Sequence, residues 1–477
     1  MKTRFAPSPT GYLHIGGLRT ALYSWLYAKR KGGKFVLRIE DTDRERYVEG
    51  AIDLIYRTLK DAGLYYDEGP DVGGPNGPYI QSERMVMYKE YAHELVKKGK
   101  AYYCFCTKER LDSMREADPT FKYDKHCKHL SNEEIEENIK NGVPYVIRQD
   151  MPNEGEISYE DLVFGKVSVP ASDLDDNILL KSDGMPTYNF ANVVDDHLMG
   201  ITHIIRGSEY LSSTPKYNLL YEAFGWEIPS YMHLPPVMKD AQHKLSKRNG
   251  DASYEDLLAK GYLKEAIINY IALLGWSPGD NQEIFSLDEL VYAFDVKGIN
   301  KSPAIFDEAK LRWMNAEYIR LMSKEKFLQI CEPYFEQVFG DKEFDKDILA
   351  EILQPRLEVL TDIPQKVGFL VEFGNYDPEL FLHKKMKTNF EIAKNSIAYA
   401  ISGLNNVDWT HDAIYDYLVN IAETIGYKKG QFLFSIRIAI TGVAVTPGGA
   451  IEAALLLGKE ETLRRLNYSL DILSLRK

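Results

Sequence analysis

The amino-acid sequence predicts an α/β Rossmann-type body with an inserted α+β segment, followed by an all-α domain. A chain of 477 residues is too long for one ordinary core and suggests several domains. Within residues 1–39, an apolar segment, a loop, a helical stretch and a second apolar segment follow one another, as in a βαβ unit. From about residue 84 to residue 178 the pattern changes to mixed helices and strands. Beyond residue 323 apolar residues recur at helical spacing, and β-hairpin signals are scarce.

The loop after the first predicted strand lies where a helix begins. Prolines in the stretch 5–13 exclude a helix there, and helical spacing starts at Leu18. His14, Gly16 and Gly17 stand just before it, at a position whose backbone N–H groups can bind phosphate. Taken alone, a histidine followed by two glycines is more often an ordinary turn.

The second strand of this unit is predicted at residues 34–39, and Glu40 follows it directly. The ligand crevice of a βαβ unit lies at the carboxyl ends of its strands, so Glu40 falls at that crevice. Taken alone, Glu40 and the acidic residues after it are more typical of a solvated helix cap. A helix is expected next, over residues 51–64.

The inserted segment contains a candidate metal site. Cys104 and Cys106 form one close pair, and Cys127 and His129 form another. Thiolate and imidazole ligands in two close pairs suit a tetrahedral structural zinc ion. His126 is a competing imidazole, and a set of unrelated thiols is the alternative.

The α/β pattern resumes at residue 177. An apolar strand, a turn and a helical stretch with Tyr188 and Asn192 precede a strand at 201–205, which ends at Arg206. In isolation Arg206 is typical of a surface arginine and Tyr188 of half-buried packing. A guanidinium can bind a carboxylate through two hydrogen bonds and keeps its proton.

A last strand is predicted at 231–238, before the lysine-rich stretch 244–248, and an amphipathic helix is predicted at 264–274. Clustered lysines usually form a solvated face. In the C-terminal part, helical periodicity is clear in three stretches, at 344–353, 388–404 and 451–466.

Two of these stretches together resemble the signatures of a known enzyme class. His14–Gly17 resembles the HIGH motif, and Lys244–Arg248 resembles the KMSKS motif, of class I aminoacyl-tRNA synthetases. Arg4–Gly11 and Arg38–Asp43 are similar to the glutamyl branch of that class. Glycine replaces the second histidine of HIGH, as it often does in glutamyl enzymes, and arginine replaces the last serine of KMSKS. The resemblance covers nearly the whole chain.

The resemblance implies roles for individual residues. It places around L-glutamate Arg4, Ala6, Ser8, Glu40 (on the α-ammonium), Tyr188, Asn192 and Arg206. It places near ATP Gly16, Gly17, Glu209, Lys244 and Lys247. Catalysis would fall to His14, Lys244 and Lys247. Arg356 and Arg437 match arginines that face the tRNA anticodon.

The resemblance also implies domains and partners. The Rossmann-type catalytic domain would span residues 1–322, with an inserted acceptor-binding, zinc-containing subdomain at 84–178. An α-helical anticodon-binding domain would span 323–477 and divide near residue 380. We expect a monomer that uses ATP, Mg²⁺ and a structural Zn²⁺ to activate L-glutamate and transfer it to the 3′-terminal adenosine of tRNA(Glu). Activation would need bound tRNA.

Charge, hydropathy and cysteine content argue against a DNA-binding, a membrane and a secreted protein. A formal net charge of -13 argues against indiscriminate nucleic-acid binding, and we expect no DNA partner, while local basic patches still allow a specific RNA. The N-terminus has no signal-peptide core, and the longest apolar run, near 266–276, is too short to cross a membrane. Four unevenly placed cysteines fit a reducing compartment. We therefore expect a cytoplasmic protein.

Alternatives remain at this stage. A nondiscriminating enzyme would also charge tRNA(Gln), although Arg356 speaks against it. A non-catalytic tRNA-binding paralogue would not need His14 or the two KMSKS lysines. A glutaminyl enzyme would have a different opening motif and β-barrel domains. A paralogue restricted to tRNA(Gln) stays open.

Overall fold

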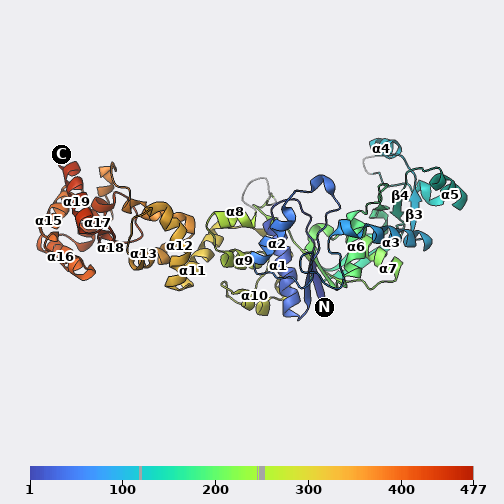
Figure 1. The fold of residues 1–477 in the computed structure, drawn as a ribbon, viewed down its shortest axis with the longest axis horizontal. Helices are drawn as coiled ribbons and strands as arrows, with labels where there is room; N and C mark the ends of the chain where they lie inside the picture. Colours follow the sequence, from blue (N-terminus) through green and yellow to red (C-terminus); the bar gives the residue numbers. More distant parts are fainter. Residues whose placement is uncertain (118–120, 244, 246–252, 476–477) are drawn as a thin grey trace. The chain divides into compact units, whose positions relative to one another are not determined.

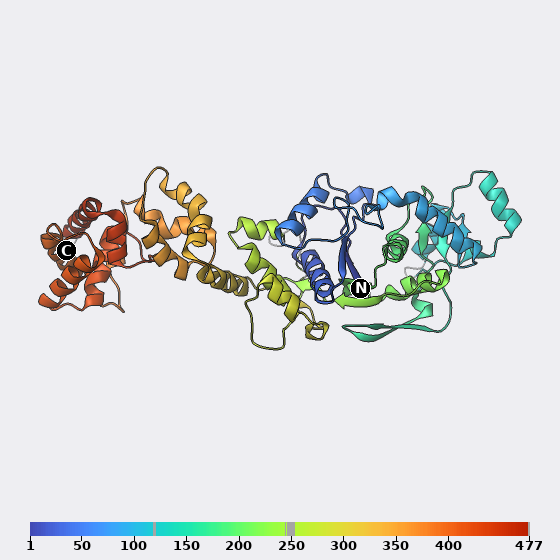
Figure 2. The same cartoon turned by 60° about the horizontal axis from the view of Figure 1, so that its bottom comes forward.

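The structure is a computed structural model that describes residues 1–117, 121–243, 245 and 253–475. It forms two compact units: residues 1–258 with 264–307, and residues 259–263 with 308–477. Figures 1 and 2 show a first unit that mixes sheets and helices and a second unit built of helices. Within the described residues, no helix is both long and apolar enough to cross a bilayer.

The first unit opens with the predicted βαβ arrangement. Strands β1 (Lys2–Phe5) and β2 (Lys34–Leu37) are parallel, with Arg4 opposite Val36, and helix α1 (Ile15–Arg30) connects them. The helix begins three residues earlier than its apolar spacing predicts, because Nδ1 of His14 accepts a hydrogen bond from the Gly16 backbone N–H and caps the helix. The glycines of the motif therefore form the first helical turn.

A second sheet continues the unit. Strands β8 (His203–Gly207) and β9 (Ser230–Leu234) are parallel, and the order β6-β5-β9-β8 adds the hairpin of β5 (Glu156–Asp161) and β6 (Gly165–Pro170). The backbone N–H of Thr202, just before β8, donates to the carbonyl of Lys2 and ties β1 to this sheet. The last predicted strand, 231–238, is split into β9 and β10 (Val237–Met238), because two prolines separate them. Strand β10 pairs with β11 (Ala304–Ile305).

Helices cover these strands. Besides α1, the described part of the first unit contains α2 (Ala51–Asp61), α3 (Met85–Lys97), α6 (Tyr188–Leu198), α7 (Thr214–Phe224), α8 (Tyr254–Ala259), α9 (Lys264–Leu273) and α10 (Leu287–Ala293), together with the helices of the inserted segment given below. Apolar side chains of α3, α6 and α7 share one core. Helix α6 carries Tyr188 and Asn192, and its Asp196 is hydrogen-bonded to Arg4 of β1.

The inserted segment carries its own small sheet. Strands β3 (Ala101–Cys104), β4 (Val146–Gln149) and β7 (Ile178–Leu180) are antiparallel. Around them lie α4 (Lys108–Ala117), the 3₁₀ helix η3 (His126–His129) and α5 (Asn132–Lys140). Neither α4 nor α5 buries a residue, so the local apolar core is a small group that includes Tyr102, Cys104, Tyr123 and Cys127.

The second unit is helical, as predicted, and has one continuous apolar core. Its helices are α11 (Glu308–Leu321), α12 (Lys324–Phe339), α13 (Lys346–Leu353), α14 (Ile363–Val367), α15 (Phe390–Leu404), α16 (His411–Thr424), α17 (Lys429–Thr441), α18 (Ala450–Leu457) and α19 (Lys459–Ser474). The predicted helix at 451–466 is two helices, because Gly458 takes φ of 77° between them. Packing groups α11 with this unit, whereas our functional boundary at residue 322 counts it with the catalytic body; that boundary stays a prediction.

Candidate active site

A cavity of about 880 Å³ opens at the carboxyl ends of β1, β2 and β8. These are the strand ends at which a Rossmann-type sheet binds its ligands. Six of the residues predicted to surround an amino acid line it: Arg4, Ala6, Ser8, Glu40, Tyr188 and Arg206. Most of the residues predicted to bind the amino acid therefore meet in one hollow.

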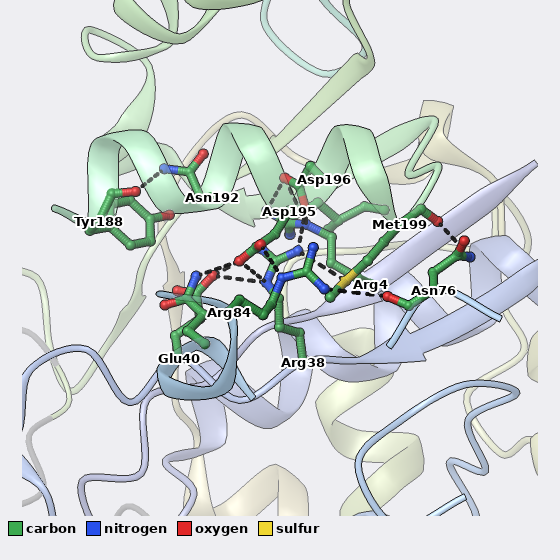
Figure 3. A network of polar contacts seen from close by, with 12 residues as sticks. Arg4, Arg38, Glu40, Asn76, Arg84, Tyr188, Asn192, Asp195, Asp196 and Met199 are labelled. Atoms are coloured by element: carbon green, nitrogen blue, oxygen red, sulfur yellow. Dashed lines mark hydrogen bonds and ion pairs between the residues drawn. The ribbon is translucent and has the colours of Figure 1, made fainter. Parts of the chain in front are cut away.

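A buried ion network forms the β1 side of this cavity (Figure 3). Arg4 donates to Asp196 through Nε, 3.0 Å from Oδ1, and through Nη2, 3.2 Å from Oδ2. Arg38 donates to the same Oδ1 through Nη1 at 2.7 Å, and its Nη2 reaches Oε1 of Glu40 at 2.9 Å. One aspartate thus holds both arginines, and Arg38 in turn holds Glu40.

The network continues away from the cavity. Asp195 accepts from Arg84 Nε at 2.7 Å, from the Tyr88 hydroxyl at 2.8 Å and from Gln81 Nε2 at 2.9 Å. In total the network sets three arginines against three carboxylates, all at most 5% exposed: Arg4, Arg38 and Arg84 against Glu40, Asp195 and Asp196. Buried charges are tolerated when they are paired in this way.

The pKa values of two carboxyl groups in the network, Glu40 and Asp196, are shifted in opposite directions. Burial raises the pKa of Glu40 above its ordinary value, and the nearby Arg38 only partly opposes this shift. Burial acts in the same direction on Asp196, but Arg38 and Arg4 outweigh it and hold the pKa of Asp196 below its usual range. Asp196 is therefore the firmly ionised anchor, and Glu40 is the carboxylate at the cavity wall.

Arg206, near the end of β8, also lines the cavity. Its Nε donates to His233 Nε2 at 3.1 Å and its Nη2 to the Thr214 hydroxyl at 2.6 Å. The guanidinium carbon lies 4.9 Å from the Tyr210 ring centre and 4.8 Å from that of Tyr217. Nη1 is buried and has no hydrogen-bond partner among the described residues. A carboxylate is the partner that such a group binds best.

The first turn of α6 lies at the cavity as well. Tyr188 lines the cavity, and burial raises the pKa of its hydroxyl well above the ordinary value, so it acts as a neutral hydrogen-bonding group. Asn192 lies one turn further along and does not line the cavity. Its Nδ2 donates to the Tyr188 carbonyl at 2.5 Å, as Figure 3 shows, and it therefore fixes the turn that carries Tyr188.

The residues predicted near ATP lie around the start of α1 and after β8. His14, Gly16 and Gly17 begin the helix, and a Cβ at Gly17 would meet Leu13 at 3.2 Å, so the glycine allows close packing. Glu209 is exposed on the 3₁₀ turn η5 (Ser208–Tyr210). None of these four residues lines the described cavity. The remaining two, Lys244 and Lys247, lie outside the described residues.

The three cysteines of the inserted segment do come together. Their sulfur atoms lie within 4.8 Å of one another, and Cys106 Sγ is 3.5 Å from Cys127 Sγ. The hydrogen bond with Cys127 lowers the pKa of the Cys104 thiol to about 4. Three convergent thiols, one of them readily ionised, are a fitting donor set for zinc.

The fourth neighbour of these sulfurs differs from the prediction. The Tyr123 hydroxyl lies 3.2 Å from Cys104 Sγ and 3.4 Å from Cys106 Sγ, while His129 is not part of the group. The reason is that Cys127 and His129 are two residues apart on η3, and a 3₁₀ helix with three residues per turn directs such side chains apart. Cys331 is buried in the core of the second unit.

The two arginines predicted at the anticodon lie in the second unit and differ in their surroundings. Arg356 is exposed at the end of the 3₁₀ turn η8 (Gln354–Arg356), and its Nη1 donates to the Ile352 carbonyl at 3.1 Å. Arg437, on α17, donates to the carbonyls of Val443 and Ala444 and so supports the loop after the helix. Arg356 therefore has the greater freedom to meet a ligand.

Comparisons with known proteins agree with this geometry. Residues 1–313 match the family of class I tRNA synthetases (E and Q), catalytic domain, and residues 317–470 match an anticodon binding domain. The chain is 60% identical over 475 residues to a glutamate–tRNA ligase of Clostridium novyi, covering 99% of this chain and 98% of that protein. It is 58% identical over 476 residues to the enzyme of Clostridium tetani, covering 99% and 97%.

Solved structures show the same likeness. The crystal structure of a glutamate–tRNA ligase from Elizabethkingia meningosepticum, in complex with its amino acid, superimposes with a TM-score of 0.91 at 36% identity and covers 99% of both chains. A glutamate–tRNA synthetase from Elizabethkingia anophelis superimposes with a TM-score of 0.88, again at 36% identity and with 99% of both chains covered. The match thus extends over both units and over both signature motifs. The chain belongs to the glutamate–tRNA ligases, within the class I (E and Q) aminoacyl-tRNA synthetases.

Proposed function

We propose that this enzyme activates L-glutamate with ATP to glutamyl-adenylate, transfers the glutamyl group to the 3′-terminal adenosine of tRNA(Glu), and rejects tRNA(Gln). The observation that carries the amino-acid assignment is the distribution of charge around the cavity. A carboxylate, Glu40, and a guanidinium with an unpartnered Nη1, Arg206, line the same hollow. Glutamate offers an ammonium group and two carboxylates, which complement this arrangement.

Each residue around the cavity then has a role. Glu40 binds the α-ammonium group, and Arg206 binds a carboxylate through Nη1. Arg4 adds positive charge beside the same ligand, although most of its donors already face Asp196 and the Ile205 carbonyl. The smaller contributions to glutamate binding come from Ala6, Ser8, Tyr188 and, through the turn it fixes, Asn192.

The chemistry needs no protein nucleophile. The α-carboxylate of glutamate attacks the α-phosphorus of ATP and pyrophosphate leaves, so the protein contributes positioning and charge stabilisation. His14, Lys244 and Lys247 face the phosphates, with Gly16, Gly17 and Glu209 near the nucleotide. Mg²⁺ neutralises the phosphates when bound. The helix start at His14 supports this assignment, since backbone N–H groups there suit an anion.

Zinc has a structural role in this proposal. Cys104, Cys106, Cys127 and the Tyr123 hydroxyl hold the ion, which fixes the inserted segment that contacts the acceptor arm of the tRNA. A closed four-coordinate site is typical of structural zinc. The enzyme acts as a cytoplasmic monomer.

Aminoacylation assays with purified tRNA(Glu) and tRNA(Gln) test the proposal directly. We expect glutamate to be attached to tRNA(Glu) and not to tRNA(Gln), with pyrophosphate exchange that depends on tRNA. Equal charging of both tRNAs would identify a nondiscriminating enzyme. Binding of tRNA without any charging would identify a non-catalytic paralogue.

A further inference from the structure

A buried histidine–aspartate pair, His233 and Asp161, contacts Arg206 without lining the cavity. His233 Nδ1 lies 2.6 Å from Asp161 Oδ2, and both side chains are fully buried. His233 and Arg206 are register partners on the parallel strands β9 and β8, so their side chains leave the sheet side by side. Asp161 is the last residue of β5, on the inserted hairpin.

The hydrogen bonds fix the protonation of this pair. Arg206 can only donate, so His233 Nε2 must be the unprotonated acceptor of the 3.1 Å bond from Nε. His233 Nδ1 therefore carries the proton and donates it to Asp161. Burial lowers the pKa of His233 and favours this neutral form.

Asp161 is in turn held as an acceptor on both oxygens. Its Oδ1 accepts from the backbone N–H groups of Val163 at 2.9 Å and Phe164 at 2.8 Å. Besides the bond from the imidazole, its Oδ2 accepts a hydrogen bond from the backbone N–H of His233 at 3.1 Å. The imidazole ring stacks on Tyr231 with centroids 5.9 Å apart. The ring therefore has one orientation and one tautomer.

We infer that Asp161 and His233 are positioning residues that determine the preference for a substrate with a carboxylate side chain. They hold Arg206 Nε, Thr214 holds Nη2, and Nη1 is left as the group that can meet a ligand in the cavity. Without the Nε acceptor, the guanidinium would be free to turn toward other partners, and its Nη1 would no longer be presented in one place. The inference rests on the proposed binding of glutamate by Arg206.

Two substitutions of His233 separate its hydrogen bond with Asp161 from its hydrogen bond with Arg206. His233→Asn keeps a donor where Nδ1 faces Asp161 but removes the acceptor for Arg206, because its side chain is too short. His233→Gln places an acceptor near the position of Nε2 and restores that contact. His203→Gln is the matched control, since His203 lies on the neighbouring strand β8 against Tyr27 and outside the cavity.

The measurement is steady-state charging of tRNA(Glu) by the full chain, with glutamate, ATP and tRNA varied in turn. We expect His233→Asn to raise KM for glutamate by about tenfold to a hundredfold, the range that a misplaced binding group produces. KM for ATP and tRNA should stay within about twofold, because only the glutamate contact is affected. His233→Gln should recover most of the loss, and glutamine should compete better against glutamate in His233→Asn than in the unmutated enzyme.

A glutamate KM and a glutamate-over-glutamine preference that are unchanged in His233→Asn would overturn the inference. Equal losses in the Asn and Gln variants would do so too, because they would point to packing alone. If His233→Asn does not fold, the same assay can compare Thr214→Val with Thr214→Ser. This comparison tests the hydrogen bond between the Thr214 hydroxyl and Arg206 Nη2, the second contact that holds the guanidinium. Failure of the unmutated protein to charge tRNA(Glu) would instead count against the proposed function.

Discussion

Arg4 and Arg206 line the same cavity and differ in the groups that neutralise their charges. Arg4 belongs to a network in which arginines and carboxylates are equal in number and paired at 2.7–3.0 Å. Arg206 forms no ion pair among the described residues, and its neighbours are a histidine, a threonine and tyrosine rings. The paired side maintains the shape of the site, whereas the unpaired side keeps a charge available for substrate.

The largest expected effect is functional and comes from the unpaired side. Arg206→Leu should reduce charging with glutamate by about ten-thousandfold, since a site that loses its partner for a polar substrate group discriminates on that scale. The free energy of unfolding should fall by only about 1–3 kcal/mol, because His233 Nε2 loses its donor but no carboxylate is left unpaired. Steady-state charging and urea denaturation of the same preparation measure both. Wild-type rate and discrimination in the variant would make Arg206 a purely structural residue.

The next effect is structural and comes from the paired side. Asp196→Ala leaves Arg4 and Arg38 buried without their shared partner, so unfolding should become easier by roughly 3–5 kcal/mol. Urea denaturation followed by circular dichroism is the measurement. Asp412→Ala is the control, since Asp412 is exposed and pairs with the exposed side chain of His411. A similar small change in both variants would show that the network is not needed for stability.

The group of Cys104, Cys106 and Cys127 differs from both arginine sites, because the charge of its thiolates would be balanced by a bound metal ion. We expect about one zinc per chain by elemental analysis of untagged protein. Removal of the zinc with a chelator should speed amide hydrogen exchange in the segment around β3 and η3, because structural zinc contributes folding energy locally. Amide protons of the second unit should stay protected. Tyr123→Phe should weaken retention of the metal, and His129→Ala should not. Full charging by metal-free protein with an ordered insertion would remove the structural role.

The smallest effect concerns tRNA choice. Glutamate and glutamine anticodons differ at the third base, C against G. Arginine can donate to the carbonyl oxygen and the unprotonated ring nitrogen of cytosine, whereas guanine presents a ring N–H and an amino group on its pairing edge and would leave an arginine placed there unpaired. One such contact discriminates by about 1–3 kcal/mol. Arg356→Gln should therefore relax rejection of tRNA(Gln) while leaving KM for glutamate unchanged. Arg437→Gln is the comparison variant. Unchanged tRNA selectivity in Arg356→Gln would contradict the assignment.

The sequence correctly predicted the features that are determined by residues close to one another along the chain, such as strands, helices and the residues at strand ends. Strand ends, prolines and apolar spacing correctly located the βαβ unit and put Arg4, Glu40 and Arg206 at the carboxyl ends of strands, where they line one cavity. The helical second part of the chain followed from periodicity. The error at 451–466 arose because the apolar period continues across Gly458, while its backbone conformation does not continue the helix.

The missed residues meet only through the tertiary fold. Asp161 and His233 are distant in the sequence and come together through the β5–β9–β8 register, which no local pattern encodes. Asp195 and Asp196 did leave a signal, since two adjacent aspartates follow two valines on a helix that is otherwise buried. Tyr123 was overlooked because a search for cysteine and histidine ligands does not consider a hydroxyl, even though Tyr123 lies between Cys106 and Cys127 in the sequence.

The position of Asp161 means that the inserted segment is not a separable module. Strand β5 of its hairpin ends in Asp161, the carboxylate that fixes His233, so a support of the proposed glutamate site comes from within the predicted insertion, residues 84–178. A shortened catalytic domain made by excising this segment would lose the contact even if the Rossmann-type sheet still folded. Exchanging insertions between relatives would likewise transplant a determinant of amino-acid choice together with the parts that meet tRNA.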